Sequence, residues 1–364
     1  MHKLLHIIKV SMIISMLQML DKKMEKIPFG LLCLILILFM PFRAGAVTYD
    51  LYGNGDSVIG QLRTVSAEYR DTLLDVARAY GFGYQDIKLL NPSVDTWLPG
   101  EGHLVELPSQ FVLPSSPRQG IVLNIPEMRL YYYPPAEGGK LRKVVTYPLG
   151  VGRQGWSTPY INTRIIEKKV NPKWYPPESI RKEHEEANDP LPKIVEAGPD
   201  NPLGDYALRL GMPDYLIHGT NKPFGIGMRV SHGCIRLYPE DIEALFQEVN
   251  VKTPVQIVNQ PYKVGVQDGI IYLEAHPYLH EDAEEFENNL TSIVKLIIDI
   301  TSERNYEVDW AAAYDVINQP RGIPVAIGMY IPEQVQVSTE ATVNGTGVKS
   351  SNALELRIDT ELSE

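Results

Sequence analysis

Cysteine is scarce in this sequence: among 364 residues there are two, Cys33 and Cys234. Cys33 lies in an apolar run near the N-terminus, which we expect to be removed during export. The single remaining thiol cannot form an internal disulfide, so a mature fold held together by disulfides is excluded. A lone thiol in an oxidising compartment indicates a chemical role for Cys234; a small buried apolar side chain is the alternative.

An excess of positive charge is also lacking. Lysine and arginine number 34 against 45 aspartates and glutamates, the net charge is -11, and no strongly basic run occurs. Nucleic-acid phosphates and anionic lipid surfaces would repel such a chain, which argues against non-specific binding to either. The hydrophobic fraction of 44% is ordinary for a globular protein, and the length allows two or three domains. The sequence has no internal repeats.

The N-terminal residues have the pattern of an export signal. Three lysines between positions 22 and 26 precede an apolar stretch, Ile27–Phe42, and the small residues Ala44-Gly45-Ala46 follow it. This order is typical of a signal peptide that is cut after the small residues. We therefore expect residues 1–46 to be a signal peptide and the mature protein to be periplasmic. An uncleaved anchor is the alternative, and Met24 is a candidate for the true start.

Residues 47–110 are predicted to form a small βααβ module. Apolar side chains recur at helical spacing after Thr72, and a second short helix is predicted to end at Asn91-Pro92. A turn at Leu98-Pro99-Gly100 then leads into a strand at Leu104–Pro108.

These pieces resemble a LysM peptidoglycan-binding module. The matching positions are Asp71-Thr72-Leu73, Ala77, Tyr80, Leu89, Asn91-Pro92, Leu98-Pro99-Gly100 and Leu107-Pro108. Arg70 stands where the family usually has glycine. The resemblance implies that the module grips the N-acetylglucosamine backbone of glycans; a small packing domain without a ligand is the alternative.

Residues 119–260 are predicted to form a mostly-β domain. Short strands are expected at Ile121–Ile125, Met128–Tyr133, Leu141–Tyr147, Ile161–Lys168, Tyr206–Leu210, Tyr215–His218 and Pro254–Val258. One helix is expected to begin at Pro239, because proline suits the first turn of a helix. The proline-rich segment Asn171–Asp200 is too long for a plain connection, so we expect it to be a functional loop or lid.

The rest of the chain carries no chemical motif. Residues 261–332 are predicted to form a small α+β extension, with a helix over Asp282–Arg304. Residues 333–364 are polar and lack helical periodicity, so we expect a disordered tail. The fold class expected for the whole chain is therefore multidomain α+β.

A cysteine and two histidines fall in two nearby stretches, His218-Gly219-Thr220 and Ser231-His232-Gly233-Cys234. A histidine within hydrogen-bond reach can take the thiol proton and give a thiolate–imidazolium pair. Gly233 allows a tight backbone turn, whose N–H groups can form an oxyanion hole. Arg236 adds positive charge, which favours the thiolate and can bind a substrate carboxylate.

This arrangement resembles the catalytic domain of the L,D-transpeptidases (YkuD type), and the similarity spans Gly120–His276. Three further stretches resemble the enterobacterial branch that anchors a lipoprotein: Met128–Tyr133, Gly198–Gly204 and Gln260–Gly265. The resemblance implies a cysteine acyltransferase of the cell wall that needs no cofactor and no metal.

The resemblance also implies a role for each residue of the motif. Cys234 is the nucleophile, His218 is the general base, and the carbonyl of Gly219 orients that base. His232 and Gly233 match the substrate-site and oxyanion positions.

Substrate binding is assigned to Arg236, Ser231, Thr220 and Tyr215. The resemblance implies that the thiol attacks the bond between diaminopimelate and D-alanine in a tetrapeptide stem of peptidoglycan. An amine then takes the acyl group from the thioester. The acceptor in this branch is commonly the C-terminal lysine of the major outer-membrane lipoprotein. A second diaminopimelate, which gives a 3-3 cross-link, is the alternative, and the long loop Asn171–Asp200 is expected to choose between them.

Three other interpretations use the same residues. An L,D-carboxypeptidase would use water in place of the amine. A zinc site would take His218, His232 and Cys234 as ligands, since catalytic zinc commonly has three protein ligands. A noncatalytic wall-binding protein with a decayed site is the third, and the intact cysteine and histidines argue against it.

Overall fold

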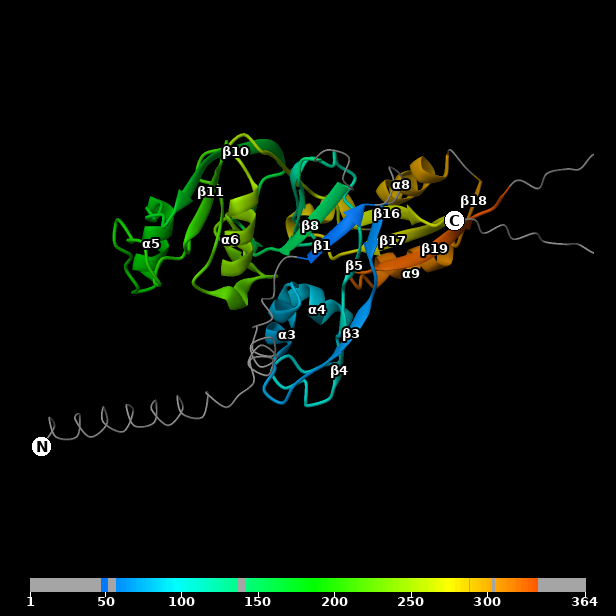
Figure 1. Cartoon of the computed structure of the whole chain (residues 1–364), viewed down its shortest axis with the longest axis horizontal. Helices are drawn as coiled ribbons and strands as arrows, with labels where there is room; N and C mark the ends of the chain where they lie inside the picture. Colours follow the sequence, from blue (N-terminus) through cyan, green and yellow to red (C-terminus); the bar gives the residue numbers. More distant parts are fainter. Residues whose placement is uncertain (1–46, 52–56, 137–141, 288, 303–304, 333–364) are drawn as a thin grey trace, which may run out of the picture.

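The computed structural model describes residues 47–51, 57–136, 142–287, 289–302 and 305–332 (Figure 1). The predicted signal peptide, with Cys33, and the predicted disordered tail lie outside the described residues. Among the helices that are described, none is both long enough and apolar enough to cross a membrane.

A nine-stranded sheet forms the centre of the molecule, in the order β1-β8-β7-β6-β15-β10-β11-β12-β14. The strands are β1 (Val47–Leu51), β6 (Gly120–Asn124), β7 (Arg129–Tyr133), β8 (Arg142–Pro148), β10 (Ile161–Val170), β11 (Tyr206–Leu210), β12 (Leu216–His218), β14 (Ile235–Arg236) and β15 (Pro254–Val258). The predicted hairpin is confirmed, because β6 and β7 pair antiparallel with Ile121 opposite Tyr132. The mostly-β domain expected from the sequence is therefore present.

The two faces of the β6–β7 hairpin belong to two different cores. Tyr132 packs into the core of the large sheet, whereas Tyr131 and Tyr133 pack into a core shared with residues 51–113. The alternation of side chains along β7 produces this division. Helix α6 (Pro239–Glu248) begins at Pro239 as predicted and buries Ile242 in the core of the large sheet.

Residues 63–107 contain the predicted β-α-α-β order. The elements are β3 (Arg63–Ser66), α3 (Leu73–Ala79), α4 (Tyr84–Leu90) and β4 (Leu104–Leu107), and β3 pairs antiparallel with β4. Thr72 and Asp75 form a capping box at the start of α3. Figure 1 shows this module, with α3 and α4, against one side of the large sheet.

Strand β1 lies outside the module in which the sequence placed it. The prediction placed residues 47–51 in the βααβ module, but they form the edge strand of the large sheet, where Val47 lies opposite Thr146. The ring of Tyr49 also meets Phe111 of β5 (Gln110–Val112) edge to face. Strand β5 pairs with β2 (Val58–Gly60), and both strands lie outside the βααβ unit.

A second sheet lies in the C-terminal part, in the order β16-β17-β19-β18. Its strands are β16 (Tyr262–Gln267), β17 (Ile270–Ala275), β18 (Tyr306–Val308) and β19 (Pro324–Tyr330), and its helices are α7 (Ala283–Phe286), α8 (Thr291–Thr301) and α9 (Trp310–Asn318). The single helix predicted over 282–304 is wrong. The side chain of Asn289 donates to the Glu285 carbonyl and accepts from the Thr291 N–H, and such local bonds compete with a continuous helix.

The long loop between β10 and β11 has structure of its own. It contains helix α5 (Glu178–Glu186), and a bridge between Trp174 and Val195 closes its base. The side chain of Asn201 donates to the Pro172 carbonyl at 2.8 Å, which fixes the point where the loop returns to the sheet.

Candidate active site

The histidine and cysteine stretches meet at the edge of the large sheet. Strands β12 and β14 pair in parallel, and His218 lies opposite Arg236. Partners in a parallel pair present their side chains on the same face of the sheet. Cys234 stands just before β14, so the register brings it to the same edge as His218.

The imidazole of His218 is buried and held in one orientation. Its Nδ1 lies 2.6 Å from the carbonyl oxygen of Gly219, and a carbonyl can only accept, so Nδ1 carries the proton. Burial, together with the charge of Arg236, lowers the pKa of His218 to about 3. The ring is therefore neutral at the pH of living cells, and Nε2 is left as an acceptor.

The thiol of Cys234 is half-buried. Its Sγ lies 3.6 Å from the carbonyl oxygen of Asp214, to which it donates. Burial raises the pKa of this thiol, and a backbone hydrogen bond from Leu216 and the charge of Arg236 oppose the rise. The raised pKa of the thiol and the neutral ring of His218 together favour a thiol and an imidazole in the resting state, rather than the thiolate–imidazolium pair that the sequence suggested.

Arg236 connects the two groups electrostatically. Its charge acts on both the imidazole of His218 and the thiol of Cys234. Burial lowers the pKa of Arg236 itself, and among the described residues its buried Nε has no hydrogen-bond partner. A half-buried guanidinium with an unpaired donor is suited to a carboxylate, which pairs with arginine through parallel hydrogen bonds.

The backbone turns sharply just before Cys234. Gly233 has a φ of 99°, and a Cβ there would lie 3.1 Å from the ring of Tyr215. The hydroxyl of Thr158 donates to the Gly233 carbonyl at 2.9 Å. No backbone carbonyl in the described part of the chain accepts from the N–H of Gly233 or Cys234, so both can donate to an oxyanion.

His232 contacts the long loop. Its Nε2 lies 3.1 Å from the Glu183 carboxylate of α5 and 3.1 Å from the Arg153 guanidinium, and its ring meets Trp156 edge to face at 4.9 Å. Burial lowers the pKa of His232, while the hydrogen bond with Glu183 opposes this. Hydrogen bonds from Arg153 and His232 in turn hold the pKa of the Glu183 carboxyl below its usual range.

Sequence reasoning missed Arg153, Trp156 and Glu183. Arg153 is 79 positions from His232 and Glu183 is 49 positions away, and none of the three lies in a recognised motif. Arg153 follows the short strand β9 (Val151–Gly152), which pairs with β13 (Arg229–Ser231) and so reaches the turn before Cys234. That pairing was not visible in the sequence.

The other predicted substrate residues have local partners. The Ser231 hydroxyl donates to the Cys234 carbonyl at 2.6 Å, and the buried Thr220 hydroxyl accepts from the Lys222 N–H at 3.0 Å. Tyr215 is half-buried, and its hydroxyl lies 3.5 Å from the Ser157 carbonyl oxygen. Ser231 and Thr220 therefore shape the turns around the site, while the ring of Tyr215 lines it.

A metal-like set of ligands occurs away from the thiol. Among the described residues, Glu127, Glu274 and His276 bring ligand atoms within 4.8 Å of one another. The ammonium of Lys263 lies 2.9 Å from Glu127 and 2.8 Å from Glu274, so a cation already occupies this place. His218, His232 and Cys234 form no such group in the described part of the chain, and the geometry does not favour the zinc interpretation.

Comparisons with known proteins agree with this geometry. The YkuD family, described as the L,D-transpeptidase catalytic domain, matches residues 118–257. "Probable L,D-transpeptidase YbiS" of Escherichia coli K12 is 40% identical over 292 residues, which cover 78% of this chain and 93% of that protein. "Probable L,D-transpeptidase ErfK/SrfK" of the same strain is 39% identical over 303 residues, which cover 82% of this chain and 96% of that protein. Identity of this extent along most of both chains shows that the protein belongs to the L,D-transpeptidase family, whose enzymes act on the stem peptides of peptidoglycan.

Proposed function

We propose that this L,D-transpeptidase uses Cys234 to cleave the bond between diaminopimelate and D-alanine in a tetrapeptide stem and passes the acyl group to an amine. The observation that carries the proposal is the half-buried Arg236, whose buried Nε lacks a partner among the described residues while its charge acts on both Cys234 and His218. A substrate carboxylate that pairs with Arg236 would lie beside the nucleophile.

The chemistry follows from the protonation states. His218 is neutral with its proton on Nδ1, so Nε2 accepts the thiol proton as the sulfur attacks the carbonyl carbon. The N–H groups of Gly233 and Cys234 stabilise the oxyanion. The C–N bond breaks, His218 returns the proton to the departing amine, and D-alanine leaves a thioester.

The second half of the reaction reverses these roles. The acceptor amine attacks the thioester carbonyl and gives its proton to Nε2 of His218. The C–S bond then breaks, and the sulfur recovers the proton as a thiol. Water in place of the amine gives the free tripeptide, which is the carboxypeptidase reaction.

We propose a lysine at the C-terminus of an outer-membrane lipoprotein as the acceptor, with a second diaminopimelate as the alternative. The long loop that contains α5 supports a role in this choice, because Glu183 reaches His232 two positions before the nucleophile. The sequence of residues 1–46 supports export to the periplasm, where both acceptors lie.

We also propose that the βααβ module binds glycan strands. The loops before α3 and after α4 lie side by side, because the Leu73 N–H donates to the Thr96 carbonyl at 2.9 Å. Large side chains are exposed there: Tyr69 at 78%, Trp97 at 66% and Leu98 at 77%. Exposed aromatic rings next to hydrogen-bonding groups suit a sugar, whose faces are apolar and whose edges are polar.

The test is intact-mass spectrometry of the mature protein incubated with a tetrapeptide stem and a lysine-ended peptide, beside Cys234→Ala. An adduct that has lost D-alanine, absent from Cys234→Ala, together with acceptor joined to the stem, supports the proposal. An adduct that yields free tripeptide alone would make the protein a carboxypeptidase. If the reduced wild-type thiol forms no adduct, the proposed mechanism is wrong.

A further inference from the structure

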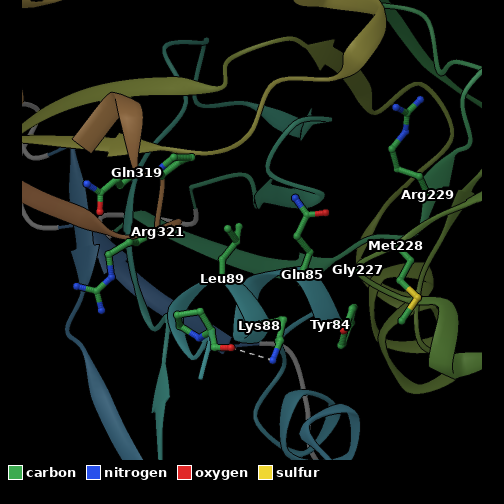
Figure 2. A pocket seen from close by; sticks show the side chains of 11 residues that line it. Tyr84, Gln85, Lys88, Leu89, Gly227, Met228, Arg229, Gln319 and Arg321 are labelled. Atoms are coloured by element: carbon green, nitrogen blue, oxygen red, sulfur yellow. Dashed lines mark hydrogen bonds between the residues drawn. The ribbon is translucent and has the colours of Figure 1, made fainter. Parts of the chain in front are cut away.

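An open cavity of about 800 Å³ lies where the βααβ module, the segment that leads into β13 and the C-terminal part meet. Helix α4 forms its centre with Tyr84, Gln85, Lys88 and Leu89. Figure 2 shows Met228 and Arg229 on one side of α4, and Gln319 and Arg321 on the other. The volume lies within the range of pockets that bind small molecules and short peptides.

The lining has a distinct chemistry. No aspartate or glutamate lines the cavity. The ammonium of Lys88 donates to two carbonyl oxygens, of Val94 at 2.7 Å and of Pro92 at 3.2 Å, and these oxygens carry no net charge. The other two cations have carboxylate partners: Arg229 pairs with Glu281, and Arg321 lies 3.3 Å from Glu106. Lys88 therefore provides the positive charge that a ligand would meet.

The remaining lining suits a peptide. The amides of Gln85 and Gln319 can each donate to and accept from a peptide backbone. Leu89 and Met228 offer apolar surface to short side chains. A neutral sugar would leave the charge of Lys88 unpaired. A peptide that carries carboxylates can pair with this cation, form hydrogen bonds with the amides and pack on the apolar surface.

The walls of the cavity are joined firmly. The N–H groups of Tyr84 and Gln85, at the start of α4, donate to the carbonyls of Ile226 and Gly227 at 3.1 and 3.2 Å. The backbones approach so closely that a Cβ on Gly227 would lie 2.2 Å from the Tyr84 nitrogen. The cavity is thus preformed, which spares a ligand the cost of ordering it.

The same wall leads to the nucleophile. Strand β13 begins at Arg229, in the cavity lining, and the chain then passes Ser231 and His232 to reach Cys234. Five residues of extended chain span at most about 17 Å. The Arg229 end of the cavity therefore lies within about 17 Å of Cys234.

We propose that this cavity binds a second stem peptide of peptidoglycan, recognised through its carboxylates, while Cys234 attacks the first. The inference rests on the proposed function, because it assumes that the substrate at Cys234 is itself a stem. The site gives the enzyme a preference for wall that carries neighbouring stems over isolated stem peptides.

The experiment measures binding of the stem tripeptide that ends at diaminopimelate, by titration calorimetry on the full mature protein. The probe carries no sugar, so the proposed glycan site of the βααβ module does not contribute. This probe lacks the bond to D-alanine and cannot be a donor, so binding is measured without chemistry. Two cavity variants are Lys88→Gln, which removes the charge, and Leu89→Trp, which fills the space. Arg236→Ala reports binding at the thiol instead, and Arg209→Gln is the matched control, since Arg209 is an exposed arginine paired with Glu167 on β10.

We expect a binding component that survives in Arg236→Ala and Arg209→Gln, weakens about tenfold in Lys88→Gln and is lost in Leu89→Trp. A probe with its carboxylates amidated should bind the wild type as weakly as the original probe binds Lys88→Gln. The proposal is overturned if both cavity variants bind like Arg209→Gln, or if Arg236→Ala removes all binding. Failure of the proposed function would appear separately, as the absence of a thioester adduct on wild-type Cys234.

Discussion

His232, two positions before Cys234, lies 3.1 Å from the carboxylate of Glu183 in the long loop between β10 and β11. Arg153 contacts both of them, at 2.5 Å from Glu183 and 3.1 Å from His232. The three side chains tie helix α5 to the turn that carries Cys234. His232 therefore joins the loop to this turn, whereas the ring of His218 is held by the Gly219 carbonyl and is the one proposed above as the base.

The Glu183→Gln variant tests the role of these contacts. We expect it to weaken the ion pair with Arg153 and the hydrogen bond with His232, and so to loosen α5. The rate of acyl transfer to the acceptor should fall several-fold, while the thioester still forms. Glu186→Gln is the matched control, because Glu186 is exposed at the end of the same helix and contacts Lys182 at 4.0 Å. Equal transfer rates in the two variants would show that the contact does not matter.

Arg236 should control the ionisation of Cys234. Burial raises the pKa of the thiol and the guanidinium opposes the rise, so Arg236→Gln should raise that pKa further. The thiolate fraction at pH 8 then falls, and alkylation of Cys234 by iodoacetamide slows. The rate should increase with pH in both proteins, and its midpoint should lie at higher pH in the variant. Arg209→Gln should alkylate like the wild type; an unchanged midpoint in Arg236→Gln would contradict the assignment.

His218 should make the folded state sensitive to mild acid. Its pKa is about 3 in the folded protein and near 6.5 in an unfolded chain, so between these values the unfolded state binds more protons. The stability from the neutral imidazole is complete above pH 6.5 and is lost as the pH falls towards 3. Urea unfolding between pH 7 and 5 should show a smaller loss of stability in His218→Gln than in the wild type. Equal losses of stability in the two proteins would refute the lowered pKa of His218.

Lys263 holds the large sheet to the C-terminal sheet through buried charges. Its ammonium contacts Glu127 and Glu274, and it donates to the Val112 carbonyl at 2.7 Å. Lys263→Met leaves two buried carboxylates without their cation, which should cost about 3 to 5 kcal/mol of unfolding free energy. Lys173→Met, at an exposed ion pair with Glu196, should change it by less than about 1 kcal/mol. Chemical denaturation at pH 7 measures the unfolding free energy of both variants. Similar losses in the two would contradict a stabilising role for the buried contacts of Lys263.

The sequence predicted the parts of the molecule whose signals are local. The β6–β7 hairpin, the start of α6 at Pro239 and the βααβ order all follow from periodicity, capping and turn residues. The Cys234 motif likewise indicated the family before any geometry was known. Contacts between distant segments could not be predicted, because no local pattern marks β1 as an edge strand beside β8 or indicates that Glu183 contacts His232.

The protonation states of His218 and Cys234 could not be predicted from the sequence either. The sequence suggested a thiolate–imidazolium pair, whereas burial of His218 and Cys234 favours the neutral form of each. Burial depends on what the rest of the chain places around a group, and motif spacing carries no information about it.

Asp241, in the first turn of α6, is a buried acid that should destabilise the protein at neutral pH. Its Oδ2 has no hydrogen-bond partner among the described residues, and burial, with the neighbouring charge of Glu240, raises its pKa to about 8. An unfolded aspartate has a pKa near 3.8, so folding takes up a proton between these values, and stability falls as the pH rises from 4 to 8. Asp241→Asn cannot ionise and should be more stable than the wild type by about 1 to 3 kcal/mol at pH 8.

The gain from Asp241→Asn should shrink towards zero near pH 4, where the wild-type carboxyl is protonated in both states. Thermal and urea unfolding at pH 4, 6 and 8 measure this dependence directly. Glu243→Gln removes an exposed carboxylate from the same helix and should show no such trend. A gain that is constant with pH would mean that the amide simply packs better, whereas a gain that grows with pH identifies the ionisation of Asp241 as the cause.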